Sequence, residues 1–223
     1  QNGTGQVDAS SISPDHAVAS EPSEAQRIEV LRGPAALAYG GSAIGGVVNI
    51  IDDRIPTAKV EGVTGRASGS YDSNNDGKAL SGALKTGFGN FVVAIDAAKR
   101  KSSDYRVETD PVSARFAAAE GLIPLADRRV KNSDVLVDAQ GAGISYVGAD
   151  GYIGVAIKKN STVYGVPYAQ VKQVGPVDPD AEGPVVIHLH QTRYDFRGEH
   201  GLDIGPFEKV RFSVGYADYE HAE

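Results

Sequence analysis

Hydrophobic and polar residues alternate along most of the chain beyond residue 57, and this period of two predicts a series of β-strands. The segment 208–221 shows it clearly, with apolar side chains on one face (Val210, Phe212, Val214, Tyr216) and polar ones on the other (Lys209, Arg211, Ser213). The same pattern predicts strands over 59–71, 78–88, 91–105, 132–147, 152–164, 185–202 and 208–221.

The connections between these strands have two very different lengths. Tight turns are expected at 89–90, 148–151 and 203–207, whereas the long connections 106–131 and 165–184 fall at the other strand ends. Short turns on one side and long loops on the other are typical of a transmembrane β-barrel with a polar lumen. A soluble β-sandwich also alternates, so alternation alone leaves both architectures open.

The first 56 residues follow a different pattern. A short strand is expected over 27–32, one and a half turns of helix over 35–39 and a second strand over 45–51, with Pro56 as a boundary. Tight turns are expected at Gly33, Pro34, Gly40, Gly41, Gly45 and Gly46. These glycines do not form a nucleotide-binding loop, because no Lys-Ser/Thr pair follows them at the start of a helix.

Composition narrows the functional classes. The net charge of −7 without a basic cluster argues against a nucleic-acid partner. The absence of cysteine removes disulfides and thiolate metal sites. No nucleophile elbow or other catalytic set occurs, so we expect no enzymatic activity and no required cofactor. No run of 18 apolar residues is present, which excludes a transmembrane helix but not barrel strands.

Two runs carry a specific resemblance. Leu31-Arg-Gly-Pro34 and Ala43-Ile-Gly-Gly-Val-Val-Asn-Ile50 resemble the second half of the plug domain of TonB-dependent outer-membrane receptors. The resemblance implies residues 1–56 as the C-terminal part of a plug and 57–223 as about seven strands of a larger barrel. The expected fold is therefore mainly β: a partial transmembrane antiparallel barrel with part of an α+β plug.

The later strands are similar, more narrowly, to zinc-uptake receptors of that family, through runs such as 103–106, 145–154, 164–167, 191–199 and 207–221. The resemblance implies an integral protein of the Gram-negative outer membrane that contacts membrane lipid and imports zinc or a metal chelate. It would be energised by the inner-membrane TonB complex through an N-terminal box outside this chain. One departure is that the loop 168–184 contains no histidine, and instead has Asp178, Asp180 and Glu182 as ligand-facing candidates.

An ionic network between plug and barrel is expected at Arg32. Glu199 and Arg211 lie opposite each other if the last turn centres near Gly205, and they point to the polar face. They are the candidate members, on the barrel side, of the network that includes Arg32. The alternative is that they form only an interstrand pair.

Metal capture is a further hypothesis. His188 and His190 alternate on one strand, about 7 Å apart at the backbone, and His221 ends the neighbouring strand at the same height. The face parity of His221 differs, so exposed histidines at the rim are the alternative. His16, in a Ser-Pro-Asp-His turn, is expected either to face the ligand cavity or to serve only the turn.

Taken together, these patterns favour the hypothesis of an active transporter for a scarce nutrient. The rival class is a β-rich surface adhesin that binds a macromolecule and transports nothing. The plug-like motif discriminates between them, since an adhesin has no lumen to close. Seven strands would leave two unpaired edges in lipid, so residues 57–223 are expected to fold only within a complete receptor.

Overall fold

The computed structural model describes residues 1–5, 16–39, 43, 45–124, 127–168, 171–172 and 184–223. Seven strands form one antiparallel sheet in sequence order: β3 (Val63–Asp72), β4 (Gly77–Phe88), β5 (Phe91–Ser102), β6 (Val135–Val147), β7 (Gly151–Gly165), β8 (Val186–Ile204) and β9 (Phe207–Ala222). The predicted strands are found with boundary shifts of a few residues. The predicted mainly β, antiparallel fold class is confirmed.

The N-terminal elements form a separate small unit. A two-stranded antiparallel sheet pairs β1 (Arg27–Leu31) with β2 (Val47–Ile51). The 3-10 helix η2 (Pro22–Glu24) precedes it. The predicted short helix is present as the 3-10 helix η3 (Gly33–Tyr39) rather than as an α-helix. Gly33 and Gly46, with φ of 71° and 140°, adopt backbone that favours glycine and form the turns expected there.

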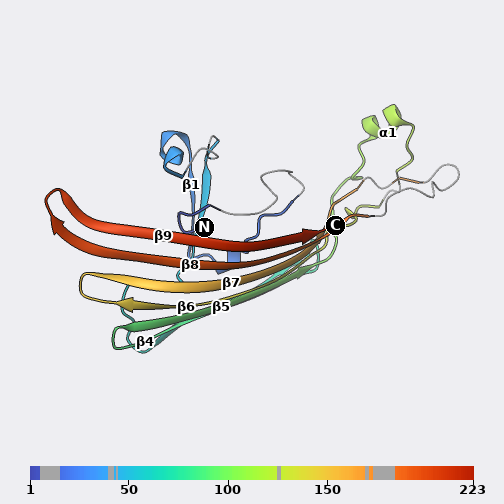
Figure 1. Ribbon diagram of the computed structural model, residues 1–223. Coiled ribbons are helices and arrows are strands. Elements are labelled where there is room, and N and C mark those ends of the chain that lie inside the picture. The colour runs from blue at the N-terminus through green and yellow to red at the C-terminus, as the bar shows by residue number, and fades with distance from the viewer. Residues whose placement is uncertain (6–15, 40–42, 44, 125–126, 169–170, 173–183) are drawn as a thin grey trace.

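The sheet is long and curved, and the N-terminal unit lies on one of its faces (Figure 1). We call residues 1–56 the plug segment and the sheet β3–β9 the wall. The end of the wall that carries α1 (Ala114–Glu120) also holds the chain's C-terminus, and we call it the α1 end (Figure 1). The tight turns at 89–90, 148–150 and 205–206 lie at the opposite, hairpin end.

Helix α1 lies within a connection for which the sequence predicted no helix. Ser113 caps its N-terminus by accepting a hydrogen bond from the Phe116 amide, and Gly121, with φ of 64°, ends it in left-handed backbone. At seven residues the helix is short, and its apolar periodicity is too brief for a reliable prediction.

The two faces of the wall differ as the alternation requires. Toward the plug segment point small or buried residues such as Val92, Ala94, Ala139, Ile187 and Leu189, each at most 3% exposed. The opposite face presents apolar side chains that remain exposed: Leu80, Leu84, Phe91, Ile95, Val155, Tyr194, Phe196, Val214 and Tyr216. Part of the buried core therefore lies between plug segment and wall, and a further part, with Val112, Ala117 and Val130, lies in the connection that contains α1.

Across the parts of the chain that the structure describes, none of the helices has the length and apolar character needed to cross a membrane.

Candidate functional site

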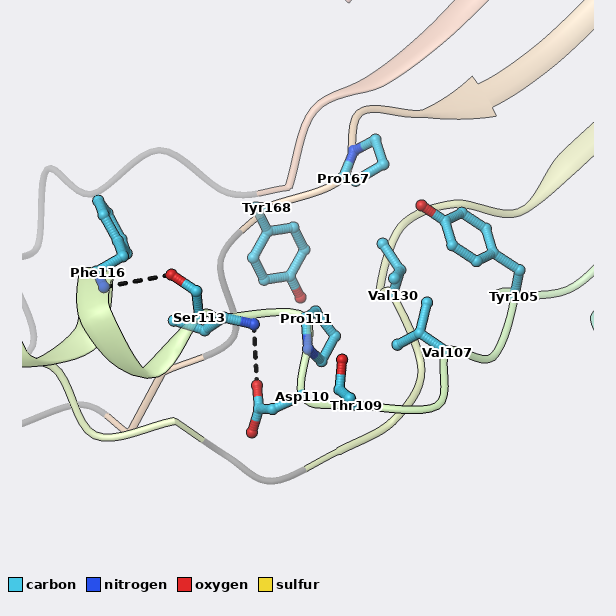
Figure 2. Close-up of a pocket in the computed structure, with 11 residues that line it drawn as sticks. Tyr105, Val107, Thr109, Asp110, Pro111, Ser113, Phe116, Val130, Pro167 and Tyr168 are labelled. Atoms are coloured by element: carbon cyan, nitrogen blue, oxygen red, sulfur yellow. Dashed lines mark hydrogen bonds between the residues drawn. The ribbon is translucent and has the colours of Figure 1, made fainter.

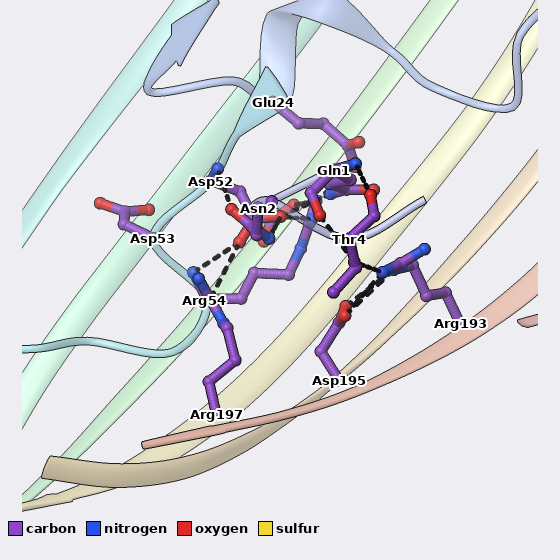
Figure 3. A network of polar contacts seen from close by, with 12 residues as sticks. Gln1, Asn2, Thr4, Glu24, Asp52, Asp53, Arg54, Arg193, Asp195 and Arg197 are labelled. Carbon is purple, nitrogen blue, oxygen red and sulfur yellow. Dashed lines mark hydrogen bonds and ion pairs between the residues drawn. The ribbon is translucent and has the colours of Figure 1, made fainter. Parts of the chain in front are cut away.

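A buried cluster of charged side chains joins the end of the plug segment to the wall (Figure 3). The Arg54 guanidinium lies 3.0 Å from a Glu24 carboxylate oxygen, 2.9 Å from Asp52 and 2.6 Å from Asp96. Lys158 Nζ lies 2.7 Å from the second Glu24 oxygen. Asp96 comes from β5 and Lys158 from β7, so these five residues, the Arg54 cluster, bridge the two units.

All five side chains are almost completely removed from water. Their exposed fractions run from 2% for Glu24 to 9% for Asp96. A charge in such a place is tolerated only when opposite charges and hydrogen bonds compensate it. Three carboxylates face two cations, and Arg197 of β8, 3.9 Å from Asp52, supplies a third. The cluster is therefore electrically balanced only when plug segment and wall are together.

The surroundings shift the pKa values of the plug-segment members. Burial raises the pKa of the Glu24 carboxyl, while the charges of Lys158 and Arg54 oppose that change. Burial acts the same way on Asp52, but the Arg54 charge and hydrogen bonds from Asn2 and Gln1 outweigh it and lower the pKa. Burial alone would lower the pKa of Arg54, but the neighbouring carboxylates raise it further above its usual range. Asp52 and Arg54 thus stay ionised near neutral pH.

Glycines in the wall make room for this contact. A Cβ atom on Gly143 of β6 would collide with the Arg54 carbonyl, and one on Gly141 with the Arg54 side chain. In β7, a Cβ on Gly154 would come within 2.6 Å of Ile55, which is itself 2% exposed. The segment Arg54–Ile55 can lie flat on the wall because these three positions carry no side chain.

Further polar contacts surround the cluster. Arg193 of β8, 2% exposed, lies 2.9 Å from Asp195 and donates hydrogen bonds to Gly5 O at 3.2 Å and to Thr4 Oγ1. Lys85 of β4 lies 2.7 Å from Asp53, and Arg100 of β5 lies 3.1 Å from Glu21. Arg66 of β3 donates a hydrogen bond to Glu24 O at 2.9 Å. Polar contacts therefore join plug segment and wall along five strands, β3, β4, β5, β7 and β8.

A second group of polar side chains lies at the α1 end of the same interface. His16 of the plug segment, with His221 and Glu223 at the end of β9, forms what we call the rim cluster. Their potential ligand atoms all lie within 4.8 Å of one another, with His16 Nε2 3.1 Å from Glu223 Oε1. The Tyr164 hydroxyl of β7 accepts a hydrogen bond from the Ala17 amide at 2.7 Å and so holds the loop beside the wall.

The rim cluster is a chemically suitable ligand set for a transition metal. Two imidazoles and one carboxylate are the donors that zinc takes in many proteins, at about 2.0–2.2 Å from the metal. The present spacing requires only small side-chain movements to meet one ion. The plug segment contributes His16 to this ligand set, and the wall contributes His221 and Glu223.

A cavity of about 740 Å³ lies farther out, in the connections near α1 (Figure 2). Apolar and aromatic side chains dominate its lining: Tyr105, Val107, Pro111, Phe116, Pro167 and Tyr168. Thr109, Asp110 and Ser113 add polar groups, and Asp110 accepts a hydrogen bond from the Val112 amide at 2.9 Å. Such a mixture suits an aromatic organic ligand better than a bare ion.

The predicted network at Arg32 differs from the observed one. Arg32 is exposed, and the structure records no ion pair for it with any described residue. Glu199 and Arg211 face each other in register, as predicted, with 2.5 Å between them, and Lys209 lies 2.9 Å from Glu199. The pair lies toward the hairpin end, and no hydrogen bond or ion pair joins either residue to a described residue of the plug segment, so the alternative interstrand pair describes it.

The predicted histidine group is also divided. The strands β8 and β9 keep a regular register from His188 to Gly201, and His221 is paired with Leu189. Neighbouring residues of a strand point to opposite faces, so His188 and His190 lie on the face opposite His221. They cannot share one ion with it. His16, for which the sequence left open a ligand-facing role or a role in the turn alone, takes their place beside His221.

Some predicted residues fall elsewhere. Gly40, Gly41, Asp178, Asp180 and Glu182 lie outside the described residues. Pro34 lies in η3, and Gly45 directly precedes the Gly46 turn.

Sequence reasoning missed the Arg54 cluster. One signal in the sequence could have indicated this cluster. Asp96 is a charged residue whose neighbours on the same face of its strand, Ala94 and Ala98, are small and apolar. Charged residues on the inward face of predicted strands require buried partners. The run Asp52-Asp53-Arg54 at the end of the plug segment supplies three charges to meet them.

The fold and the interface define a class: a curved antiparallel wall whose inner face is occupied by a small N-terminal unit. Residues 1–47 match the family model described as TonB-dependent Receptor Plug Domain. The chain also resembles, in fold alone, the FrpB iron transporter from Neisseria meningitidis (F3-3 variant), with a TM-score of 0.65, 15% identity, and coverage of 92% of this chain and 31% of that one.

Two relatives from Pseudomonas aeruginosa add sequence evidence. The ferric enterobactin receptor PirA is 52% identical over 56 residues, which is 25% of this chain and 7% of the relative. A second ferric enterobactin receptor is 32% identical over 126 residues, 50% of this chain and 16% of the relative. The comparisons support the TonB-dependent receptor family for this chain, which spans a small part of each relative's length. They do not support the zinc-uptake branch.

Proposed function

We propose that the chain forms part of a TonB-dependent receptor of the outer membrane, which imports a metal-containing nutrient past a plug domain whose C-terminal part is residues 1–56. The observation that carries the proposal is the buried Arg54 cluster, in which plug segment and wall each neutralise the other's charge. A surface adhesin would gain nothing from such an internal stopper. The apolar, exposed opposite face of the wall supports contact with membrane lipid.

The rim cluster favours a metal ion, with zinc as the leading candidate. His16 belongs to the plug segment, whereas His221 and Glu223 belong to the wall. An ion held there would touch both units, so its binding would be coupled to the position of the plug. We infer that movement of the plug, drawn from the periplasm by the inner-membrane TonB complex, would separate the ligands and release the ion inward.

A ferric chelate is the second candidate. The aromatic cavity near α1 supports it, because flat aromatic groups of an organic chelator would pack against Tyr105, Phe116 and Tyr168. The names of the two Pseudomonas relatives, which refer to ferric enterobactin, favour the same class of ligand.

Uptake by cells that express the complete receptor separates these candidates. We expect the double variant His16→Ala/Glu223→Gln to lower zinc affinity by at least about tenfold, because a ligand from each unit is lost. The matched control is His188→Ala/His190→Ala, which changes two histidines on the opposite face and should leave uptake unchanged.

The outcomes are distinct. Unaltered zinc uptake by the His16/Glu223 variant would reject the metal-ion hypothesis. Loss of ferric-chelate uptake on changing Tyr105 and Tyr168 to Ala, with zinc unaffected, would establish the second candidate. A receptor that moves neither ligand would leave the adhesin as the better description.

A further inference from the structure

Three lysines gather on the face of the wall turned away from the plug segment, at its α1 end. Lys78 of β4 is paired directly across the sheet with Lys101 of β5, and Lys99 lies two residues farther along on the same face. The three positions are exposed. We call them the lysine cluster.

The direct pairing of Lys78 with Lys101 is unfavourable by itself. Like charges on opposed positions of adjacent strands repel each other. Within the described part of the chain neither lysine forms an ion pair, and the flanking partners on this face are Tyr71 and Leu136, which are uncharged. Lys99 has one partial partner, Asp138, at 3.6 Å. An anion from outside the chain would relieve this repulsion.

The position of the cluster indicates what the anion is attached to. A band of exposed apolar side chains begins next to the lysine cluster, on the same face and toward the hairpin end. It includes Leu80, Leu84 and Ile95, which are 67%, 50% and 49% exposed. A lipid whose acyl chains cover this band would carry its headgroup to the height of the three ammonium groups. Long basic side chains at the edge of an apolar band are suited to that level of a membrane.

We propose that the lysine cluster binds the phosphorylated headgroup of a membrane glycolipid in the leaflet at the α1 end. A phosphate offers three acceptor oxygens and more than one negative charge, enough to bridge ammonium groups whose backbones lie about 5–7 Å apart. The inference rests on the proposed function only in that the wall must lie in a membrane. It does not depend on which nutrient is transported.

The test uses the full-length receptor in detergent micelles, titrated with bisphosphorylated lipid A and followed by native mass spectrometry. We expect the variant Lys78→Gln/Lys101→Gln to bind lipid A at least about tenfold more weakly, since each lost charge-assisted contact contributes about a factor of ten. Dephosphorylated lipid A should bind receptor and variant alike. Inorganic phosphate should bind far more weakly than the lipid, because it lacks the acyl chains.

Two further variants make the result specific. Lys159→Gln removes a lysine on the same face whose cross-strand partner is the neutral Gln140, and it should leave lipid A binding nearly unchanged. Lys101→Arg keeps the charge and should retain binding. In lipid-free detergent, Lys101→Gln should raise the melting temperature because the repulsion is gone, whereas with lipid A it should lower it.

Equal binding by receptor and double variant, or an equal loss in the Lys159 variant, would overturn the lipid proposal. Failure of the proposed function has a different signature. In that case the receptor would not fractionate with the outer membrane of the expressing cells, whatever its lysines bind in micelles.

Discussion

Each carboxylate around Arg54 occupies a place from which water is excluded, so its stability depends on the cation beside it. Glu24, Asp52 and Asp96 converge on one guanidinium, with all four side chains at most 9% exposed. Removing one partner from a buried ion pair leaves a charge without compensation, and this is more damaging than the pair itself is stabilising.

We therefore expect Arg54→Ala to destabilise the docked plug segment by about 3–5 kcal/mol. Differential scanning calorimetry of the complete receptor would measure the loss as a lower melting temperature or as a separate plug transition. The matched control is Arg27→Ala, whose partner Glu29 lies 2.7 Å away on an exposed surface with Arg27 67% exposed. That change should cost less than about 1 kcal/mol. Similar losses in both variants would contradict the role given to Arg54.

The pH dependence of the stability of the docked plug segment follows from the pKa of Asp52. Its pKa is lowered in the folded protein, so its contribution is fully present above the unfolded value of 3.8 and is lost as pH falls through the folded value. Glu24, with a raised pKa, acts in the opposite sense, because its protonation on acidification relieves the cost of burying its charge.

The plug transition should therefore weaken mainly below about pH 4. In Asp52→Asn this acid-induced loss should be reduced, although the variant is less stable at neutral pH. Melting temperatures between pH 3 and 7 would show it, and an unchanged acid slope in the variant would contradict the assignment.

At the scale of elements, β6 and β7 are shaped to receive the chain that leaves the plug segment. Gly141, Gly143 and Gly154 occupy inward positions where any side chain would collide with Arg54 or Ile55. These glycines let the backbone of the plug segment approach the backbone of the wall closely. The alternation of polar and apolar residues in the sequence does not reveal such an approach.

Gly143→Ala should thus displace Arg54 and destabilise plug docking by about 1–3 kcal/mol, the usual range for overpacking. Gly82→Ala in β4 is the matched control, since its nearest neighbour would lie 3.7 Å away, an ordinary contact. Limited proteolysis of the plug segment in the complete receptor would report displacement. Equal protection of both variants would show that β6 tolerates the added methyl group.

At the scale of the whole molecule, the wall ends in two strands that pair on one side only. β3 pairs with β4 and β9 with β8, and no other described strand pairs with the outer edge of either, so both edges of the seven-stranded sheet are open within the described part of the chain. Among the described residues, the plug segment lies on its inner face (Figure 1). Such a sheet is an unfavourable structure in isolation, because unpaired edges are sites of aggregation.

Residues 57–223 expressed alone should consequently aggregate or stay unfolded, whereas the complete receptor should run as a compact band before heating and a slower one after it. Circular dichroism and size-exclusion chromatography would check the shorter chain. A soluble, monomeric, cooperatively unfolding product would argue against the barrel role.

The alternation of polar and apolar side chains was sufficient to predict the seven strands, the positions of the tight turns between them and the mainly β fold. The reason is that a period of two is a local property of the chain. The plug-like motif was equally local. The sequence also paired Glu199 with Arg211 correctly, since antiparallel partners have a constant index sum.

Only the tertiary structure decided which charged and potentially metal-binding side chains of the plug segment meet those of the wall. Arg54 and Asp96 are separated by 42 residues, and His16 and Glu223 by 207, so no local pattern connects them. The regular register of β8 and β9 likewise separates His188 and His190 from His221. The physical reason is that the contacts between plug segment and wall depend on how two units dock, whereas strands depend only on neighbours along the chain.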